Sequence, residues 1–261
     1  MASEPRQRIV TLAPNLAELV YAAGAGDLLV GVSAYSDFPP EALDLPVVGD
    51  AFMIDQERLS MLEPDLLLVW HGGTPAHVVD ELRAAGYNVR VMRTNTLDDV
   101  ARSIIEIGSL AGRQESAQQA VEVYTKELDR IRSTQVTKAT IRVFYQVSRR
   151  PLFTVSSGHY ISELIELCGG TNVFADLGDL APTIGVEAVV ERDPEVMMAS
   201  MDAGEDAFAE WQRWPDIAAN RYGNHFQMPA DEIGRATPRL VHAAVSVCDA
   251  LDEARARRGT Q

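Results

Sequence analysis

The side chains that could do chemistry are scattered along this sequence and form no catalytic motif. Its five histidines, His71, His77, His159, His225 and His242, include no H-x-x-x-H pair. A zinc or manganese site would need His71, His159 and His225 to converge with carboxylates in the fold. The sequence has no G-x-S-x-G, G-x-x-x-x-G-K-S/T or G-x-G-x-x-G motif, so it offers no nucleophile elbow and no phosphate loop. We therefore predict no catalytic residues, no metal site and no resident cofactor.

The strongest local signal is the segment Trp70-His71-Gly72-Gly73. It ends the continuous apolar run 66–70, which is typical of a buried strand in a parallel sheet. Ligands bind at the carboxyl ends of such strands, so we expect the Trp70 ring at the mouth of a binding site. Two glycines there would let a large ligand approach the backbone closely. The alternative is that Trp70 only covers the core.

A second polar segment, Asp231-Glu-Ile-Gly-Arg235, precedes the last predicted helix. Asp231 and Arg235 would give hydrogen bonds to a polar, amide-rich ligand. The alternative is a solvated loop that caps the helix. We interpret the nearby aromatic residues Trp211 and Trp214 as core packing.

The elements that must position these residues alternate between strands and helices. In the first half, strands are predicted at 8–12, 28–33, 46–49, 66–70 and 89–92, and helices at 15–23, 55–62, 75–86 and 96–111. Asp55 is the expected N-cap of one helix, and Thr96 with Asp99 resembles a capping box. This order indicates an α/β lobe with a parallel sheet and right-handed crossovers.

One long helix is expected between the two halves, over about 114–134. Its apolar stripe consists of Ala117, Val121, Tyr124, Leu128 and Ile131. In the second half, strands are predicted at 141–147, 153–156 and 196–199, and helices at 160–168, 186–192 and 238–251. The fold class predicted is therefore α/β, with two Rossmann-like lobes at 8–112 and 138–255, each with a central parallel sheet, joined by one long helix at 113–137.

Two pairs of segments are similar in the two halves. Ala17-Glu-Leu19 followed by Gly24 parallels Ser162-Glu-Leu164 followed by Gly169. Likewise, 62–68 parallels 192–198, and both pairs keep the same order. Chance similarity of strand and helix junctions would explain this, and so would two related lobes.

Composition limits the classes of partner. The 261 residues are 46% hydrophobic and 23% charged, and 23 basic against 38 acidic residues give a net charge of −15. Such a chain repels nucleic-acid phosphates and anionic lipid, so we predict no nucleic-acid partner. Two explanations of the negative net charge are solubility and docking onto a basic partner. The polar start 1–8 contains no signal peptide, which fits a cytoplasmic protein or the mature part of an exported one. Cys168 and Cys248 are two thiols or one disulfide.

Several segments together resemble a known family. They are Arg8-Ile-Val-Thr-Leu-Ala-Pro14 with Glu18-Leu19, Gly31 to Pro40, Glu57 to Leu59, Leu62 to Leu66, Trp70 to Gly73, Leu167 to Gly170, Asn172 to Phe174, Ala236 to Arg239, and Cys248 to Leu251. On these residues the chain resembles the periplasmic substrate-binding proteins of ABC importers for large chelates. It is similar to their helical-spine type (cluster A or class III), and most of all to the cobalamin-binding branch.

The resemblance implies a binding protein for vitamin uptake, not an enzyme. It would capture cobalamin or a related corrinoid between two lobes and deliver it to an inner-membrane ABC permease. The protein would be a monomer, periplasmic or membrane-anchored and extracytoplasmic. The resemblance also implies a disulfide between Cys168 and Cys248, which would close a loop of about 80 residues.

The resemblance also implies a set of ligand-binding residues. A corrin is a broad apolar plate rimmed with amides, so it needs aromatic walls and a few polar groups. Trp70 matches the aromatic residue that packs on the corrinoid. The full expected set is Pro14, Phe38, Phe52, Trp70, His71, Gly72, Gly73, Phe153, Asp231 and Arg235.

Two positions depart from the family pattern. His71 stands where the cobalamin binders have an arginine, so a haem or iron-siderophore ligand is the alternative within the family. Ala76 stands where the family has a glutamate that docks onto the permease. The docking residues expected instead are Asp80, Glu81, Glu205 and Asp206. From another class, the alternative is a metal chaperone or an enzyme with a histidine site between the lobes.

Overall fold

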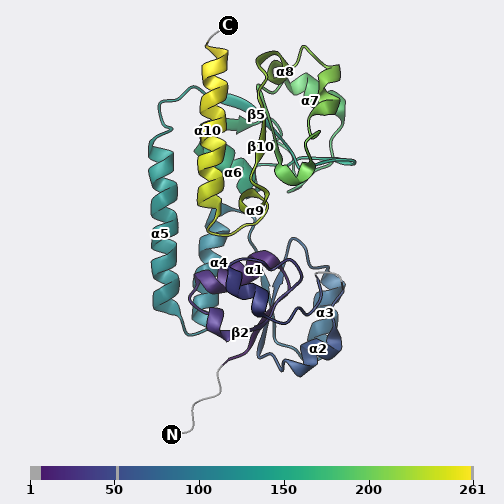
Figure 1. Cartoon of the computed structure of the whole chain (residues 1–261), viewed down its shortest axis with the longest axis vertical. Helices are drawn as coiled ribbons and strands as arrows, with labels where there is room; N and C mark the ends of the chain where they lie inside the picture. The colour runs from purple at the N-terminus through teal and green to yellow at the C-terminus, as the bar shows by residue number, and fades with distance from the viewer. Residues whose placement is uncertain (1–6, 51–52, 260–261) are drawn as a thin grey trace. The chain divides into compact units, whose positions relative to one another are not determined.

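The computed structural model describes residues 7–50 and 53–259 (Figure 1). The chain divides into two compact units, with the division between Thr125 and Lys126. We call them the N unit and the C unit and describe each by itself. Helix α5 (Gln114–Ser133) runs across the division, and its predicted stripe is buried except for the half-buried Val121. The lobe boundaries at 8–112 and 138–255, with a link at 113–137, stay a prediction.

The sheet of the N unit has four parallel strands. They are β1 (Ile9–Thr11), β2 (Leu29–Gly31), β3 (Leu66–Trp70) and β4 (Val89–Met92), in the order β2-β1-β3-β4. Each was predicted, although β2 is shorter than expected. The predicted strand at 46–49 forms only isolated bridges, which join Val32 to Val47 and Gly49 to Ile54.

Helices cover both faces of this sheet. They are α1 (Pro14–Ala22), α2 (Gln56–Met61), α3 (Ala76–Ala84) and α4 (Leu97–Leu110), with 3-10 turns η1 (Gly26–Leu28) and η2 (Pro40–Asp44). Buried side chains of α2 and α3 pack with β1 and β3 in one cluster, while α1 and α4 contact each other. The predicted caps are confirmed, because Asp55 accepts from the Arg58 N–H at 2.9 Å, and Thr96 and Asp99 form a capping box.

The C unit has a second four-stranded parallel sheet. Its strands are β5 (Ile141–Gln146), β8 (Gly170–Asn172), β9 (Val196–Ser200) and β10 (His225–Met228), in the order β10-β9-β5-β8. A hairpin of β6 (Ser148–Arg149) and β7 (Leu152–Phe153) follows β5. The sequence did not predict β8 or β10. The strand predicted at 153–156 was wrong in its extent, since only β7 forms there.

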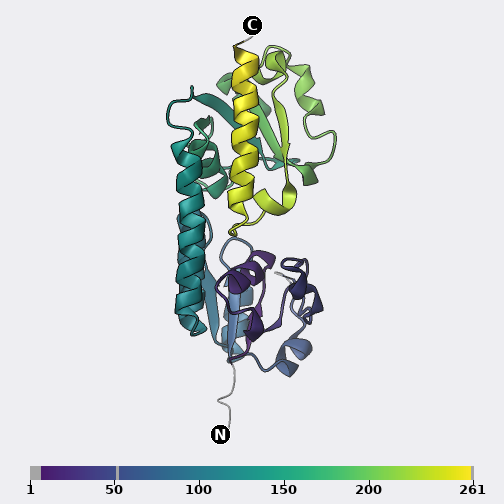
Figure 2. The same cartoon turned by 60° about the vertical axis from the view of Figure 1, so that its left-hand side comes forward.

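The helices of the C unit are α6 (Tyr160–Leu167), α7 (Val186–Arg192), α8 (Ala218–Tyr222), α9 (Ala230–Ile233) and α10 (Leu240–Arg258). The 3-10 turns are η3 (Met201–Ala203) and η4 (Ala209–Arg213). Helix α10, yellow in Figure 2, runs alongside α6. On the other face, Phe144 packs edge-on against Phe174 and Trp211, with ring centroids 5.7 and 5.5 Å away. The interpretation of Trp211 as core packing is therefore confirmed.

The two sheets share one connectivity. If strands are counted within each unit, both sheets have the order 2-1-3-4. The similar sequence segments fall at matching places, and their details match too. Glu63 and Asp193 both have φ of 41°, just before the third strand, and Gly24 and Gly169 have φ of 74° and 72° after the first helix. These matches favour two related lobes over chance similarity.

The predicted disulfide between Cys168 and Cys248 is present. It joins the end of α6 to α10, and both cysteines are buried. Arg255 strengthens this join, because its guanidinium donates to the Cys168 carbonyl at 2.8 Å. None of the helices in the described part of the chain combines the length and hydropathy of a membrane span.

Candidate ligand-binding site

The predicted binding residues of the N unit lie on loops at one edge of its sheet. Because all four strands are parallel, their carboxyl ends meet at the same edge. Pro14 follows β1, Phe38 follows β2, and Trp70 with His71 ends β3. The structure thus brings these predicted residues to one edge. The sequence missed Tyr35, which lies on the loop after β2 and is 80% exposed.

The two glycines after Trp70 have a different use from the one predicted. A Cβ built on Gly73 would lie 2.4 Å from Cε3 of Trp70, and a Cβ on Gly72 would lie 2.8 Å from its Cζ2. The indole ring therefore occupies the space that side chains would need there. The glycines seat the Trp70 ring, a use that was not predicted, while the approach of a ligand to them stays a prediction.

The turn after β3 is fixed by its backbone. The His71 N–H donates to the Met92 carbonyl at 2.9 Å, and the Thr74 N–H donates to the Trp70 carbonyl at 2.9 Å. The His71 side chain is exposed. The Nε1–H of Trp70 is buried and has no partner among the described residues. Trp70 is thus a half-buried aromatic side chain held in one position at the edge.

A buried polar contact links two loops of this edge. Asn15, in the first turn of α1, donates from Nδ2 to Oγ1 of Thr94 at 3.3 Å, and both residues are buried. Thr94 lies on the loop that follows β4. Neither residue was predicted from the sequence, since neither belongs to a motif.

The predicted residues of the C unit also lie at the carboxyl edge of their sheet. Phe153 is half-buried in the hairpin that follows β5. Asp231 and Arg235 follow β10, on and just after α9, with Asp231 exposed and Arg235 half-buried. Phe52 of the predicted set lies outside the described residues. The placement agrees with the prediction for the other residues, but their contact with a ligand stays a prediction.

Buried titratable groups surround the start of α6. Burial raises the pKa of Tyr160, whose hydroxyl donates to the Ile233 carbonyl at 3.1 Å. Burial lowers the pKa of His159 to about 4, and Nδ1 of this histidine accepts from the Ile161 N–H at 3.1 Å. His159 is therefore a neutral N-cap of α6, and Tyr160 is a neutral hydrogen-bond donor.

The alternative of a histidine metal site is not supported within the C unit. His159 precedes α6, whereas His225 begins β10 at the amino end of the sheet and stacks on Phe208 at 5.1 Å. The part of the chain that the structure describes holds no group of three side chains able to ligate a metal. His71 lies on the N unit, exposed, as described above.

The predicted docking residues are all exposed. Asp80 and Glu81 lie on α3, and Glu205 precedes η4. Asp206 is paired with Arg149, with 3.0 Å between Oδ2 and Nη1, and this arginine lowers the pKa of its carboxyl group. Glu205 is thus a better candidate than the paired Asp206 for a contact with another protein. All four assignments stay predictions.

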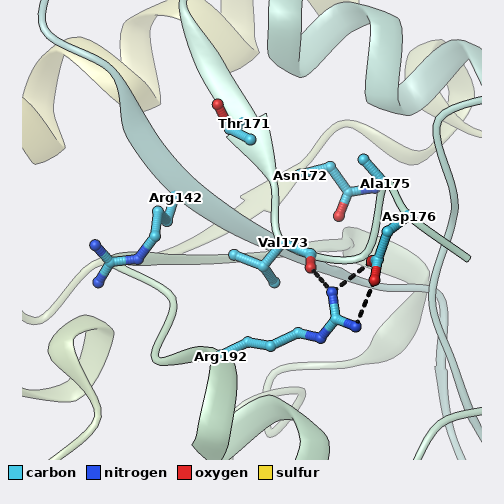
Figure 3. Close-up of a pocket in the computed structure, with 7 residues that line it drawn as sticks. All are labelled: Arg142, Thr171, Asn172, Val173, Ala175, Asp176 and Arg192. Carbon is cyan, nitrogen blue, oxygen red and sulfur yellow. Dashed lines mark hydrogen bonds and ion pairs between the residues drawn. The ribbon is translucent and has the colours of Figure 1, made fainter.

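A separate cavity of about 350 Å³ lies in the C unit, beside the edge strand β8 (Figure 3). Its lining residues are Arg142, Thr171, Asn172, Val173, Ala175, Asp176 and Arg192. Figure 3 shows Arg192 turned toward Asp176, with Nη2 and Oδ2 2.9 Å apart, and Arg142 pointing away from this pair. Arg192 is paired with Asp176, and Arg142 bonds to the Asp193 carbonyl, so both arginines that line this cavity already have partners.

Comparisons with known proteins agree with this fold. The family described as "Periplasmic binding protein" matches residues 9–232. The chain therefore belongs to the periplasmic binding protein family. This family consists of binding proteins, so the predictions of a non-enzymatic and periplasmic protein are confirmed.

Individual relatives are similar over nearly the whole chain. A vitamin B12-binding protein of Vibrio parahaemolyticus is 35% identical over 259 residues, which are 99% of this chain and 94% of the relative. The crystal structure of the periplasmic vitamin B12 binding protein of Vibrio cholerae is 36% identical, has a TM-score of 0.84, and covers 96% of this chain and 98% of its own. A periplasmic heme binding protein of Vibrio cholerae has a TM-score of 0.81, over 94% of this chain and 98% of its own, but only 21% identity, so it shows the fold alone.

Proposed function

We propose that this protein captures cobalamin or a related corrinoid and delivers it to an ABC permease. The observation that carries this proposal is the 35% identity, over 99% of the chain, with a vitamin B12-binding protein. The exposed aromatic residues at the edge of the N unit support it, because a corrin ring needs an apolar surface to pack on.

Trp70 is the main ligand contact in this proposal. Its ring is held on Gly72 and Gly73, and it therefore loses little freedom when a ligand packs against it. Pro14 and Phe38 extend the apolar surface of the same edge, and Phe52 is proposed as a further neighbour. From the C unit, Phe153 adds an apolar contact, while Asp231 and Arg235 bond to the amide groups of the ligand.

Docking onto the permease is proposed for acidic residues on each unit. Asp80 and Glu81 on α3 serve the N unit, and Glu205 and Asp206 serve the C unit. Their exposure supports this role. The net charge of −15 would speed the encounter with a basic permease surface. We propose that the protein acts as a monomer.

One observation favours a second ligand. The exposed imidazole of His71 is a side chain that ligates haem iron in other proteins. Titration with haemin would show a Soret band that shifts in the wild type and not in His71→Ala. An equal shift in both proteins would remove His71 from this role.

Calorimetric titration with cyanocobalamin tests the main proposal. We expect binding at micromolar ligand or below, and a loss of more than about tenfold in affinity for Trp70→Ala, since the aromatic contact is lost. Trp214→Phe, a change in the apolar cluster around Phe144 in the C unit, is the control and keeps the wild-type affinity. No heat at micromolar cyanocobalamin would overturn the corrinoid ligand, and an unchanged affinity of Trp70→Ala would show that the site lies elsewhere.

A further inference from the structure

Helix α6 is fastened at both of its ends. At its C-terminal end, the disulfide joins Cys168 to α10, and Arg255 donates to the carbonyls of Cys168 and Gly169. At its N-terminal end, the Tyr160 hydroxyl donates to the carbonyl of Ile233, the last residue of α9. Figure 1 shows α6, α9 and α10 together in the C unit. The helix thus connects the disulfide of this unit to the segment that carries Asp231 and Arg235.

The bond between Tyr160 and Ile233 is well suited to hold that segment. Both residues are buried, and Ile233 is fully buried, so water does not replace the bond. Burial raises the pKa of Tyr160, and its hydroxyl therefore stays protonated and can donate at neutral pH. The ring of His159 lies 4.3 Å from the Tyr160 ring and limits its movement.

The N unit uses the same arrangement. The matching sequence segments align Tyr160 with Asn15, since Ser162-Glu163-Leu164 corresponds to Ala17-Glu18-Leu19. Asn15 bonds to Thr94, on the loop after β4, and Tyr160 bonds to the segment after β10. In both units the first turn of the first helix thus fastens the loop that follows the fourth strand.

We propose that Tyr160 is a positioning residue for ligand binding, which holds the Asp231–Arg235 segment in its binding conformation. This inference rests on the proposed function, in which Asp231 and Arg235 contact the ligand. Tyr160 itself does not need to touch the ligand. It acts by restricting the segment to its binding conformation before the ligand arrives. The free-energy cost of ordering the segment on binding is therefore smaller, and the affinity is higher.

Tyr160→Phe tests the inference, with Tyr124→Phe as the matched control. Tyr124 is also buried, and its hydroxyl donates to a backbone carbonyl, that of Leu97 at 3.3 Å, but in the N unit. Both variants lose the same kind of bond, so a general loss of stability would affect them equally. We expect the Kd for cyanocobalamin to rise about fivefold in Tyr160→Phe and to change less than twofold in Tyr124→Phe.

A double-variant cycle separates positioning from a structural role. Arg235→Ala should raise the Kd by about tenfold. In a background that carries both Asp231→Ala and Arg235→Ala, Tyr160→Phe should then change the Kd by less than twofold, because both groups that it positions are gone. A full fivefold effect in that background would overturn the inference, and so would an Arg235→Ala variant that binds like the wild type.

Hydrogen exchange of the ligand-free protein gives a result that does not depend on the ligand. The amides of Ile233 and Gly234, which donate to Pro229 and Ala230, should exchange about fivefold faster in Tyr160→Phe and at the wild-type rate in Tyr124→Phe. If the wild type fails to bind cyanocobalamin, the proposed function fails, and this measurement alone decides whether Tyr160 holds the segment. Unchanged exchange in Tyr160→Phe would overturn the inference.

Discussion

The N unit and the C unit share the same order of strands and helices, which we call the frame, but different interactions stabilise it in each unit. Both place a residue with φ of 41° before the third strand, Glu63 in one and Asp193 in the other. In both, the carboxylate two residues later accepts from the backbone N–H of an arginine, Arg8 for Asp65 and Arg142 for Glu195. Among the described residues, the C unit alone adds a disulfide to this frame, and its Glu195 also pairs with the exposed Arg258.

The carboxyl edges of the two sheets differ more than the frames do. In the N unit, β1 leads almost directly into α1, and the edge presents Trp70 seated on glycines. In the C unit, the hairpin β6–β7 separates β5 from α6, and polar bonds hold the edge. Gln146, for example, donates to the Ala207 carbonyl and accepts from Nε1 of Trp211. Both edges thus contain buried hydrogen bonds, and the edge of the N unit adds the packing of the Trp70 ring on its glycines.

Removal of the disulfide should produce the largest difference in stability between the two units. In Cys168→Ala/Cys248→Ala, the free energy of unfolding of the C unit should fall by roughly 4–5 kcal/mol, because a separation of 80 residues is no longer closed in the unfolded chain. Urea unfolding, with hydrogen exchange at β1 and β9 to separate the units, measures this change. Equal losses at both strands would show that the units do not differ in this way.

Acid should weaken the C unit through two half-buried histidines. Burial lowers the pKa of His159 to about 4, and burial, followed by the charge of Arg257, lowers that of His225. Between pH 6.5 and 4, His159 binds a proton in the unfolded chain but stays unprotonated in the folded C unit. The stabilisation from His159 is therefore complete above pH 6.5 and is lost as the pH falls toward 4, by up to about 3 kcal/mol.

His159→Asn keeps a side chain that can cap α6 and removes the titration. Urea midpoints measured from pH 7 to pH 4 should fall less steeply in this variant than in the wild type. Identical slopes would contradict a neutral His159 in the folded protein.

The paired carboxylates Asp65 and Glu195 allow a direct comparison of the units. Glu195 is 8% exposed and also accepts from Arg258 at 2.9 Å, whereas Asp65 is exposed. Glu195→Gln should therefore lower the free energy of unfolding by about 2 kcal/mol, and Asp65→Asn by about 0.5 kcal/mol. Chemical denaturation of both variants checks the ratio, and equal losses would argue against the difference in burial.

Gly73→Ala should show that packing positions the edge of the N unit. Its Cβ would displace the Trp70 ring, so the affinity for cyanocobalamin should fall about fivefold, or about 1 kcal/mol. Gly178→Ala is the matched control, since a Cβ there meets nothing within 4 Å. An unchanged affinity in Gly73→Ala would mean that the ring does not depend on this seat.

Much of the frame was predictable because its signals are local. Continuous apolar runs such as 66–70 indicate buried parallel strands, and Thr96 with Asp99 marks a helix start. The strands β8 and β10 were not predicted, because the three residues Gly170–Asn172 and the mixed segment His225–Met228 have no periodic apolar pattern. Their neighbours β5 and β9 determine that they are strands.

The site was predictable only where a motif pointed to it. Trp70 follows a recognisable strand, and the parallel sheet determines which edge it occupies. The contacts of Asn15 with Thr94 and of Tyr160 with Ile233 join residues 79 and 73 positions apart, and no local pattern predicts such pairs. The seat of Trp70 was also missed, since two glycines fit both a ligand approach and a packed ring equally well.

The uneven distribution of the three tryptophans has an optical consequence. The two in the C unit, Trp211 and Trp214, have ring centroids 5.7 Å apart and would exchange excitation with each other, while Trp70 belongs to the N unit. A coloured ligand that packs on Trp70 would quench its emission by energy transfer. After Trp211→Phe and Trp214→Phe, Trp70 would be the single emitter, so the protein carries an intrinsic fluorescent reporter at the edge where the ligand is proposed to bind.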